Sequence, residues 1–600
     1  MAPKGSEDVA NKPRKRPDVV QRLKDRKGKQ ERVVKCSLQK VLTEKHLMPE
    51  IQKWVVTTSK ITQKGSLVFN KLLLHCLNRD LNLPDLTDQT LYLQCFNVGS
   101  GRLNKSIPSV KDVWGSYFKD FPKIEKNKGD TQAYVYSSKQ YMTNFKTSLV
   151  YTFEGRQKHY ISKWCKEHSI DKEQCHAIRC AVNRWNCKTE VKDEVKDFIM
   201  EQQALLGNTE ELHLTWLGSH MENVVRYFYH ILTYLEQFED ERLFTLAPIC
   251  SIKSHYLTID TTVLYEMLKN LKHVNCEREV FIELKKEQFE SIFNLKGLCS
   301  GEFGYMVETD GVSACFHFKV PSKIKTLGNR ALKKEQRVIA IDPGRCNLIY
   351  GVEKLEDDKL KTYRLTRASY YTKAGMKKFN KKSAGWEKTI EKEELIFRRH
   401  SLKTAKEEEW KSFLEDYISV YDALWDCKTK KKWGRERFSV YGLKRKTLDR
   451  FFQTMENNEN VKPVIAYGAA KFNPNSTHEL SAPTTFLSKR CSKHFSMVLI
   501  DEYNTTKVCS CCDEKLLPVV KDGLEIRGLR WCGSFLRKTK SFSTKCRTFL
   551  NRDLNAALNI LRCFESQTNR PQHLSRNSGK VKGGTTLNGK SSFYLSNKAR

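Results

Sequence analysis

Residues 498–512 of the chain read VLIDEYNTTKVCSCC, and residues 546–560 read CRTFLNRDLNAALNI. The first stretch joins a short apolar run to two acids, Asp501 and Glu502, and then to a Cys-x-x-Cys pair. A third stretch, VIAIDPG at residues 338–344, is another apolar run that ends in an acid at a tight turn. Short apolar runs bounded by turn residues are typical of buried strands. Acids at the ends of such strands lie at a sheet edge, where together they can hold magnesium, and magnesium pairs cleave phosphodiesters.

Three acids are the candidate metal ligands at this sheet edge. Asp342 ends its strand, Glu502 follows the apolar run 498–500, and Asp553 stands at the start of an Ala-rich helix. Taken alone, Asp342 also suits a turn beside a proline, and Asp553 also suits the positive end of the helix dipole. Asp501 competes with Glu502, because successive residues of a strand point to opposite faces and only one of the two can face the other acids.

The cysteines of the same region have the spacing of a zinc site. Cys509 and Cys512 form a zinc knuckle, Cys532 follows after 19 residues, and Cys546 follows after another 13. Such spacing fits a zinc ribbon whose second knuckle is expanded. Cys511 can replace Cys512 only in a cramped Cys-x-Cys arrangement. We expect a structural Zn²⁺ here, because the insert has too few apolar residues to form a core of its own.

The composition indicates a polyanionic partner. The chain has 600 residues and a formal net charge of +36, which is far more than solubility requires and is typical of nucleic-acid-binding proteins. No apolar run approaches the roughly 18 residues of a membrane span, and no signal peptide is expected. We therefore expect most of the 20 cysteines to be reduced.

The two ends of the chain are polar. Residues 1–35 contain two basic clusters about ten residues apart, one at 12–16 and one at 22–29, which resemble a bipartite nuclear import signal. We expect residues 1–35 to be a disordered basic arm that directs the protein to the nucleus. The arm can also grip phosphates, and the two roles are compatible. Residues 566–600 lack apolar periodicity, so we expect a disordered tail.

The remaining chain divides by its hydrophobic pattern. Helical periodicity dominates up to residue 245, as in 216–234, whereas 256–260 and 314–320 alternate as strands do. We expect a multidomain α/β protein with separate α and β regions. Its expected parts are a strand at 36–44, a helical domain at 45–245, a β-rich domain at 246–335, an α/β core at 336–504, the zinc-binding insert at 505–550 and a final core segment at 551–565.

The order of these motifs resembles the split RuvC nuclease core and zinc insert of TnpB transposon nucleases. It resembles their eukaryotic relatives, the Fanzor proteins, still more closely. Besides the three stretches above, KWGRERFSVYGLKRKTLDRFF at 432–452, AYGAAKFNP at 466–474 and SAPTTFLSKR at 481–490 are Fanzor-like. The specific likeness covers residues 335–563. Upstream, only the order of strand, helical block and β-block is similar to the wedge and recognition regions of the family.

The resemblance implies an RNase H-like RuvC nuclease core with an inserted zinc ribbon, a helical recognition lobe and a small β-barrel wedge domain. Asp342 matches the first catalytic acid and Asp553 the third. In most TnpB proteins the second acid ends the strand that corresponds to VIAYGAA, where this chain has Tyr467 and Gly468. Fanzor proteins use a displaced glutamate, and Glu502 matches its position.

The resemblance also implies an RNA-guided DNA endonuclease. Such a protein binds a noncoding guide RNA as a monomeric ribonucleoprotein and cuts double-stranded DNA beside a short flanking motif. Two Mg²⁺ ions at Asp342, Glu502 and Asp553 would catalyse hydrolysis of the phosphodiester, and no phosphate-binding loop for ATP is present. Two other interpretations remain: a domesticated nucleic-acid-binding relative that has lost cleavage, and a RuvC-like resolvase without a guide.

Overall fold

The computed structural model of the protein describes most of the chain between the basic arm and the tail. The first basic cluster, the second one up to residue 28, the middle of the zinc-binding insert and the last residues of the predicted tail lie outside the described residues. The described residues are 29–102, 106–171, 173–187, 189–321, 337–355, 359–456, 462–469, 472, 481–532, 546, 548–566 and 570–576.

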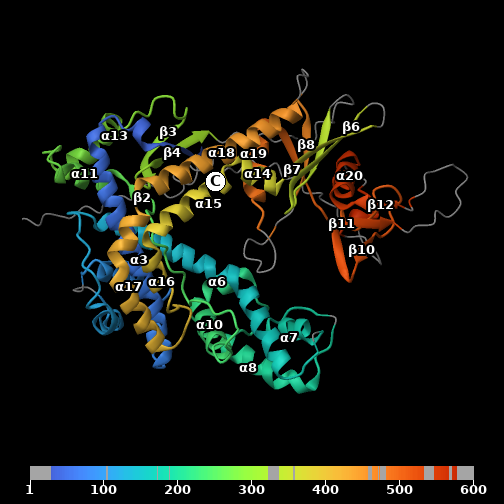
Figure 1. Ribbon diagram of the computed structural model, residues 1–600, viewed down its shortest axis with the longest axis horizontal. Coiled ribbons are helices and arrows are strands. Elements are labelled where there is room, and N and C mark those ends of the chain that lie inside the picture. The colour runs from blue at the N-terminus through green and yellow to red at the C-terminus, as the bar shows by residue number, and fades with distance from the viewer. Residues whose placement is uncertain are drawn as a thin grey trace, which may run out of the picture.

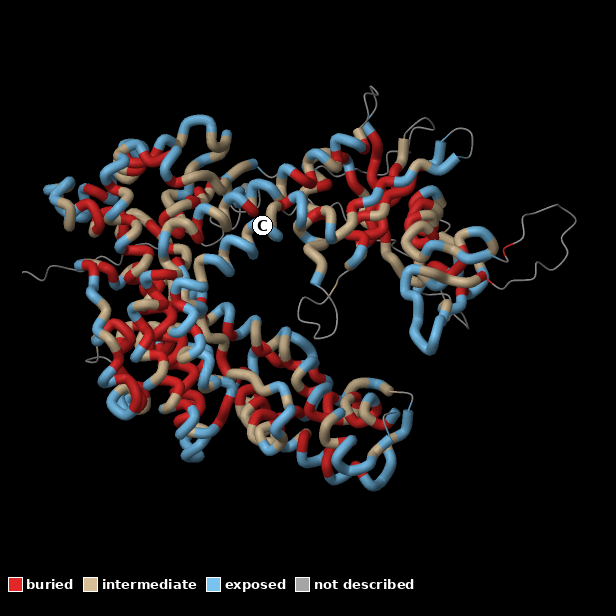
Figure 2. Tube along the Cα trace, in the orientation of Figure 1, coloured by how far each residue is buried: buried red, intermediate tan, exposed pale blue. Residues whose placement is uncertain are grey.

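The protein is a multidomain mixture of helices and sheets (Figure 1). A helical body and a four-stranded sheet lie on one side, and a five-stranded sheet lies on the other. The long helix α18 (Lys431–Glu456) runs between them, contacting the four-stranded sheet and packing against helices beside the five-stranded sheet. Buried residues concentrate inside the helical body and in the five-stranded sheet (Figure 2). No helix of the described residues is long and apolar enough to cross a membrane.

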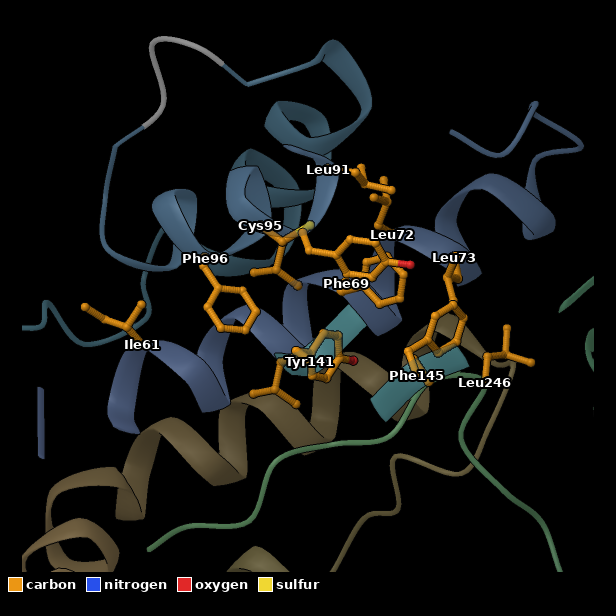
Figure 3. Packing of buried hydrophobic residues seen from close by; sticks show 14 of the residues in the cluster. Ile61, Phe69, Leu72, Leu73, Leu91, Cys95, Phe96, Tyr141, Phe145 and Leu246 are labelled. Carbon is orange, nitrogen blue, oxygen red and sulfur yellow. The ribbon is translucent and has the colours of Figure 1, made fainter. Parts of the chain in front are cut away.

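The helical body is built around a buried aromatic and aliphatic core. Phe69 meets Tyr141 and Phe145 edge-on, with ring centroids 5.7 and 5.1 Å apart (Figure 3), a geometry that adds to the burial of the rings. These rings come from α3 (Met48–Asn78) and α6 (Thr131–Glu167). The other helices up to residue 235 are α2 (Leu38–Val41), η1 (Lys45–Leu47), α4 (Gln89–Gly99), α5 (Pro108–Val113), η2 (Trp114–Phe118), α7 (Gln174–Val182), η3 (Asp193–Val195), α8 (Lys196–Leu206), α9 (Leu214–Ser219) and α10 (Met221–Leu235).

Helix α17 (Glu407–Lys428) belongs to this helical body. Its Tyr417 hydroxyl donates to Gln63 Oε1 at 3.0 Å, and its Tyr421 ring lies 5.2 Å from Phe121. The predicted boundary that placed all of 336–504 in one α/β core is therefore wrong for this segment, because the aromatic stripe of α17 is buried against helices from the N-terminal half. Besides α17 and α18, the helices between residues 367 and 494 are α14 (Arg367–Lys373), α15 (Met376–Glu387), η4 (Lys388–Ile390), α16 (Glu391–Phe397) and α19 (Thr484–His494).

The predicted β-rich region forms an open sheet and not a barrel. Its order is β1-β4-β3-β2, so β1 and β2 are edge strands that do not pair with each other in the described part of the chain. Three helices interrupt it. The strands and helices are β1 (Lys29–Ser37), β2 (Leu257–Ile259), β3 (Glu302–Thr309), β4 (Ser313–Pro321), α11 (Thr261–Asn270), α12 (Arg278–Glu283) and α13 (Lys285–Ile292).

The first strand lies earlier than the sequence pattern indicated. Residues 29–35, which we expected in the disordered arm, pair with β4 from Lys29↔Pro321 to Ser37↔Ser313. The expected strand at 36–44 ends at Ser37, because the chain then turns into α2. A basic, polar strand is stable here because its backbone is paired along its whole length with β4, and this pairing depends on a partner almost 300 residues away.

The five-stranded sheet has the order β7-β6-β5-β8-β9. Strands β5, β6 and β7 pair antiparallel, whereas β8 pairs parallel with β5 and β9 parallel with β8. The carboxyl ends of β5, β8 and β9 therefore meet at the same edge. The strands are β5 (Val338–Asp342), β6 (Asn347–Lys354), β7 (Leu360–Thr366), β8 (Val464–Gly468) and β9 (Ser496–Ile500).

Helices cover both faces of this sheet. Ile339 and Ile341 pack on one face with residues of α18 and α19. Ala340 and Ala466 pack on the other face with α20 (Arg552–Glu565). The small side chains on this second face let α20 lie close to the strands, and the alternation places Asp342 on the same face as Ala340.

A small three-stranded sheet follows β9, in the order β10-β11-β12. Its strands β10 (Leu517–Lys521), β11 (Leu524–Cys532) and β12 (Thr548–Asn551) are mostly exposed (Figure 2). Beyond α20, a short turn η5 (Gln572–Leu574) buries Leu574 completely. The predicted disordered tail is therefore wrong for residues 570–576, because one leucine anchors this segment to the core.

Candidate functional site

Asp342 is the buried end of the central strand β5. Only 6% of its surface is exposed, because β6 and β8 flank it and α20 covers its face of the sheet. Pro343 and Gly344 follow directly and turn the chain out of the sheet. The strand pattern placed this carboxylate at the sheet edge, and the structure has it there.

Asp553 lies in the first turn of α20, at the end of the five-stranded sheet where Asp342 ends β5. Asn551 caps the helix, and its Oδ1 accepts from the backbone N–H groups of Asp553 and Leu554 at 3.1 and 3.0 Å. The carboxylate of Asp553 is held from the sheet: Asn347 Nδ2 donates to Asp553 Oδ2 at 2.6 Å. Arg364 Nε donates to Asn347 Oδ1 at 2.8 Å, so the amide is fixed with its N–H group toward the acid.

Glu502 extends over the end of β8. Gly468 is the last residue of that strand, and a Cβ built there would overlap Glu502 Oε1 and lie 2.9 Å from Pro343 Cδ. The glutamate carboxylate therefore lies directly against the Gly468 backbone, next to the turn that follows Asp342. The side chain that is missing at Gly468 leaves the space that Glu502 fills.

Asp501 has different surroundings from its neighbour. Arg576 donates to its carboxylate through Nε at 2.7 Å and Nη2 at 2.9 Å. Arg570 Nη2 donates to the Asp501 carbonyl at 2.6 Å. Arg576 lowers the pKa of Asp501, as expected for a carboxylate in a bidentate ion pair. Asp501 thus fastens the segment after α20 to the end of β9.

The pKa of Asp342 responds to the other two acids. Burial raises the pKa of Asp342 well above its usual range, and the charges of Glu502 and Asp553 raise it further. Arg552 lowers it in part. Neighbouring carboxylates repel one another, and a bound divalent cation would compensate their charge. Carboxylate oxygens are the ligands that Mg²⁺ prefers, so the donor set fits this ion.

The four predicted zinc ligands come together in the small sheet. The Sγ atoms of Cys509, Cys512, Cys532 and Cys546 all lie within 4.8 Å of one another, and Cys512 Sγ and Cys532 Sγ are 3.5 Å apart. Thiolates on a tetrahedral zinc with bonds of about 2.3 Å lie about 3.8 Å apart. The cluster fits a zinc ribbon, and the exposed Cys511 lies outside it.

The backbone around the first knuckle favours the thiolate form. Burial alone would raise the pKa of Cys509, but the backbone N–H groups of Cys511 and Cys512 lower it, and the net shift is downward. The turn closes with hydrogen bonds between Cys509 N and Glu514 O at 2.9 Å and between Asp513 N and Cys509 O at 3.2 Å. A thiolate is the form of cysteine that binds zinc.

Residues 484–560 match the family model of the Cas12f1-like TNB domain. This region of the chain is related to the TnpB/Cas12 type of protein. The matched range holds the four cysteines, Glu502 and Asp553, whereas Asp342 lies outside it. The predicted relationship to TnpB nucleases is confirmed for this region. A comparison with curated proteins found no match.

Two asparagines of α20 join the TNB cysteines to the acidic site. Asn555 Nδ2 and Asn559 Nδ2 both donate to the carbonyls of Thr505 and Val508 at 2.8–3.0 Å. Ser510 N donates to Asn555 Oδ1 at 2.8 Å. Both asparagines are buried, one helical turn apart. The helix that begins beside Asp553 thereby holds the loop that leads into Cys509.

Sequence reasoning missed these asparagines and Asn347. The signal for the pair on α20 was present, because two asparagines at i and i+4 within the apolar stripe of NAALNI must find buried partners. Asn347 carries no such signal. It lies at the start of β6, and only the pairing of β6 with β5 brings it near α20.

Proposed function

We propose that the chain is an RNA-guided DNA endonuclease of the Fanzor type, which cuts double-stranded DNA at a single RuvC site. The observation that supports this best is the placement of Asp342, Glu502 and Asp553 at one end of the five-stranded sheet, beside a region that matches a TNB domain. The mixed five-stranded sheet with α20 across one face fits an RNase H-like core. The net charge of +36 suits an RNA and a DNA partner.

The three acids would hold two Mg²⁺ ions. When bound, such ions activate a water and stabilise the leaving oxygen of the phosphodiester. The residues of the chain position these ligands. Asp342 is fixed by its buried strand, Asn347 orients the carboxylate of Asp553, and Gly468 leaves room for Glu502. Rigid placement of this kind lowers the cost of assembling the site for reaction.

The other regions would bind the nucleic acids. We assign the helical body to the recognition lobe and the four-stranded sheet to the wedge domain, on the order of elements alone. The guide RNA would select the target by base pairing, and the protein would read the backbone and a short flanking motif. DNA opening would then be driven by pairing and phosphate contacts, without ATP.

The proposal is tested by sequencing RNA that co-purifies with the full chain and by cleavage of matching DNA. We expect one RNA per protein and cleavage that needs Mg²⁺ and stops in Asp342→Ala and Asp553→Ala, with RNA binding nearly unchanged. Cleavage without any bound RNA would favour a guide-free resolvase. Bound RNA without cleavage would favour a domesticated binding protein.

We further propose that the basic arm directs the chain to the nucleus, because it holds two basic clusters. The structure sets where a deletion should end: β1 begins at Lys29 and pairs with β4, so the test removes residues 1–28 only. We expect the truncated chain to lose nuclear accumulation and to keep its cleavage rate in vitro. A large loss of RNA affinity would show that the arm binds phosphates.

A further inference from the structure

A second cluster of metal-binding side chains lies in the helical body, far in sequence from the TNB domain. It consists of His176 and Cys180 on α7 and Cys187 in the loop that follows. The ligand atoms of the three residues all lie within 4.8 Å of one another. We propose that they bind a second Zn²⁺, at a site independent of the nuclease function proposed above.

Helix geometry brings the first two ligands together. His176 and Cys180 are four residues apart on α7, so they share one face. Cys180 Sγ lies 3.8 Å from Nδ1 and 3.7 Å from Nε2 of His176. A sulfur and a nitrogen on the same tetrahedral zinc lie about 3.6 Å apart, so the separation already matches, and the exposed imidazole would turn to direct one nitrogen at the ion.

The end of α7 returns the chain so that Cys187 joins the pair. Arg184 adopts a left-handed conformation with φ +55°, and Trp185 N donates to Cys180 O at 2.8 Å. This closes the helix C-terminus. The thiols of Cys180 and Cys187 lie within 4.8 Å of each other as a result. The third ligand is therefore placed by backbone geometry.

Helix α6 and the segment between α8 and α9 hold this turn in place. Asn183 and Gln157 exchange two side-chain hydrogen bonds at 2.7 and 2.8 Å, which fasten the turn to α6. The Trp185 indole donates to Leu212 O at 2.9 Å. A ligand set on such a scaffold loses little conformational freedom when the metal binds.

The chemistry of the three donors selects zinc. Two thiolates and a neutral imidazole form a borderline-soft set that Zn²⁺ prefers, and the thiols would release their protons on binding. Arg179 Nη2 lies 3.4 Å from His176 Nδ1 and Arg179 Nη1 3.2 Å from Glu154 Oε1. Binding through Nδ1 would replace the first contact and leave the ion pair with Glu154.

The burial of the cluster indicates an open coordination position. Cys180 is buried, Cys187 is half-buried and His176 is exposed, so the ion would contact solvent on the histidine side. Zinc sites with three protein ligands carry a water or another ligand at the fourth position. The ion would therefore fasten the loop after α7 and keep one exchangeable position.

The test measures zinc in the full chain purified with its bound RNA under mild reduction. We expect about two zinc ions per wild-type chain, one at each cluster. His176→Ala and Cys187→Ser should each lose about one of them. His168→Ala and Cys175→Ser are matched controls, because they remove an exposed histidine nearby and a cysteine of α7 outside the cluster. Both controls should keep the full zinc content.

The second measurement separates this site from the TNB cysteines. In a Cys509→Ser, Cys512→Ser background, added Co²⁺ should still give a sulfur-to-cobalt absorption band, and Cys187→Ser should abolish it. Because His176 is exposed, His176→Ala keeps the fold and remains informative if a cysteine variant misfolds. A zinc content that His176→Ala leaves unchanged would overturn the proposal. So would a Cys180–Cys187 disulfide in the wild-type chain.

Discussion

The carboxylate of Glu502 lies against the backbone of Gly468, at the ends of two neighbouring parallel strands. A side chain at Gly468 and the carboxylate of Glu502 would compete for the same space. In most of the TnpB proteins that this sequence resembles, the strand that corresponds to β8 ends in the second acid. In this chain the strand ends in Gly468. A carboxylate at position 468, on β8, and one at position 502, after β9, would thus lie in the same space beside Pro343.

Gly468→Ala should lower cleavage by displacing Glu502. The added methyl would overlap Glu502 Oε1 and crowd Pro343, so we expect a drop of about 10-fold or more, as for other misplaced ligands. Gly442→Ala is the matched control, since a Cβ there meets nothing within 4 Å. Gly468→Glu combined with Glu502→Ala, which empties the space that Glu502 fills, should restore part of the activity that Glu502→Ala alone loses. Unchanged cleavage in Gly468→Ala would mean that Glu502 is not held at this point.

Glu502→Gln should lower cleavage far more than Asp501→Asn. Glutamine keeps the size of the side chain and removes a charge beside Asp342, so we expect a loss of at least about 100-fold, with RNA binding retained. Asp501 is paired with Arg576, and its replacement should change the rate little. Single-turnover cleavage rates at saturating Mg²⁺ compare the Glu502→Gln and Asp501→Asn variants. The reverse ranking would make Asp501 the metal ligand.

Asp501→Asn should instead lower stability in a pH-dependent way. Arg576 lowers the folded-state pKa of Asp501, so this stabilisation is present above the unfolded pKa and is lost as the pH falls through the folded pKa. The side chains of Asp501 and Arg576 are 41% and 67% exposed. The loss in the free energy of unfolding should therefore be below about 1 kcal/mol. The thermal unfolding midpoints of the wild-type chain and of Asp501→Asn should converge as the pH is lowered. A difference that does not change with pH would contradict this.

Asn347→Ala should weaken the metal site without removing a ligand. The amide holds the Asp553 carboxylate at 2.6 Å, and loss of such an orienting partner lowers metal affinity or activity by about 10- to 100-fold. We expect the Mg²⁺ concentration for half-maximal cleavage to rise. Excess Mg²⁺ should restore much of the rate, as it cannot for Asp553→Ala. An unchanged Mg²⁺ dependence would show that Asn347 does not position the acid.

Cys509→Ser should release the TNB zinc and reduce cleavage through α20. The loop into Cys509 is held by Asn555 and Asn559 of that helix, so loosening it should free the N-terminal turn that carries Asp553. Metal analysis and hydrogen exchange of residues 505–512 and 551–560 measure the two effects. Cys511→Ser is the matched control, because its side chain is exposed and outside the cluster. Equal zinc content in both variants would refute the assignment.

Local pattern was sufficient for the parts of the site that lie on short, strongly marked elements. The apolar runs before Asp342 and Glu502 are strands, and the Ala-rich segment after Asp553 is α20. Cysteine spacing selected the same four residues that the structure brings together. These features depend on residues close in sequence, where side-chain period and ligand spacing are decided by backbone geometry alone.

Tertiary structure decided which of these elements meet. The stripe of α17 predicts a buried helix, but only packing shows that it is buried against α3 and not against the five-stranded sheet. Among the described residues the β-rich region closes no barrel, because β1 and β2 end as separate edges. Tertiary packing also brings Glu502 onto Gly468 and Asn347 to Asp553. Each is a contact between segments distant in the chain, and sequence periodicity shows that a face is buried without showing which surface covers it.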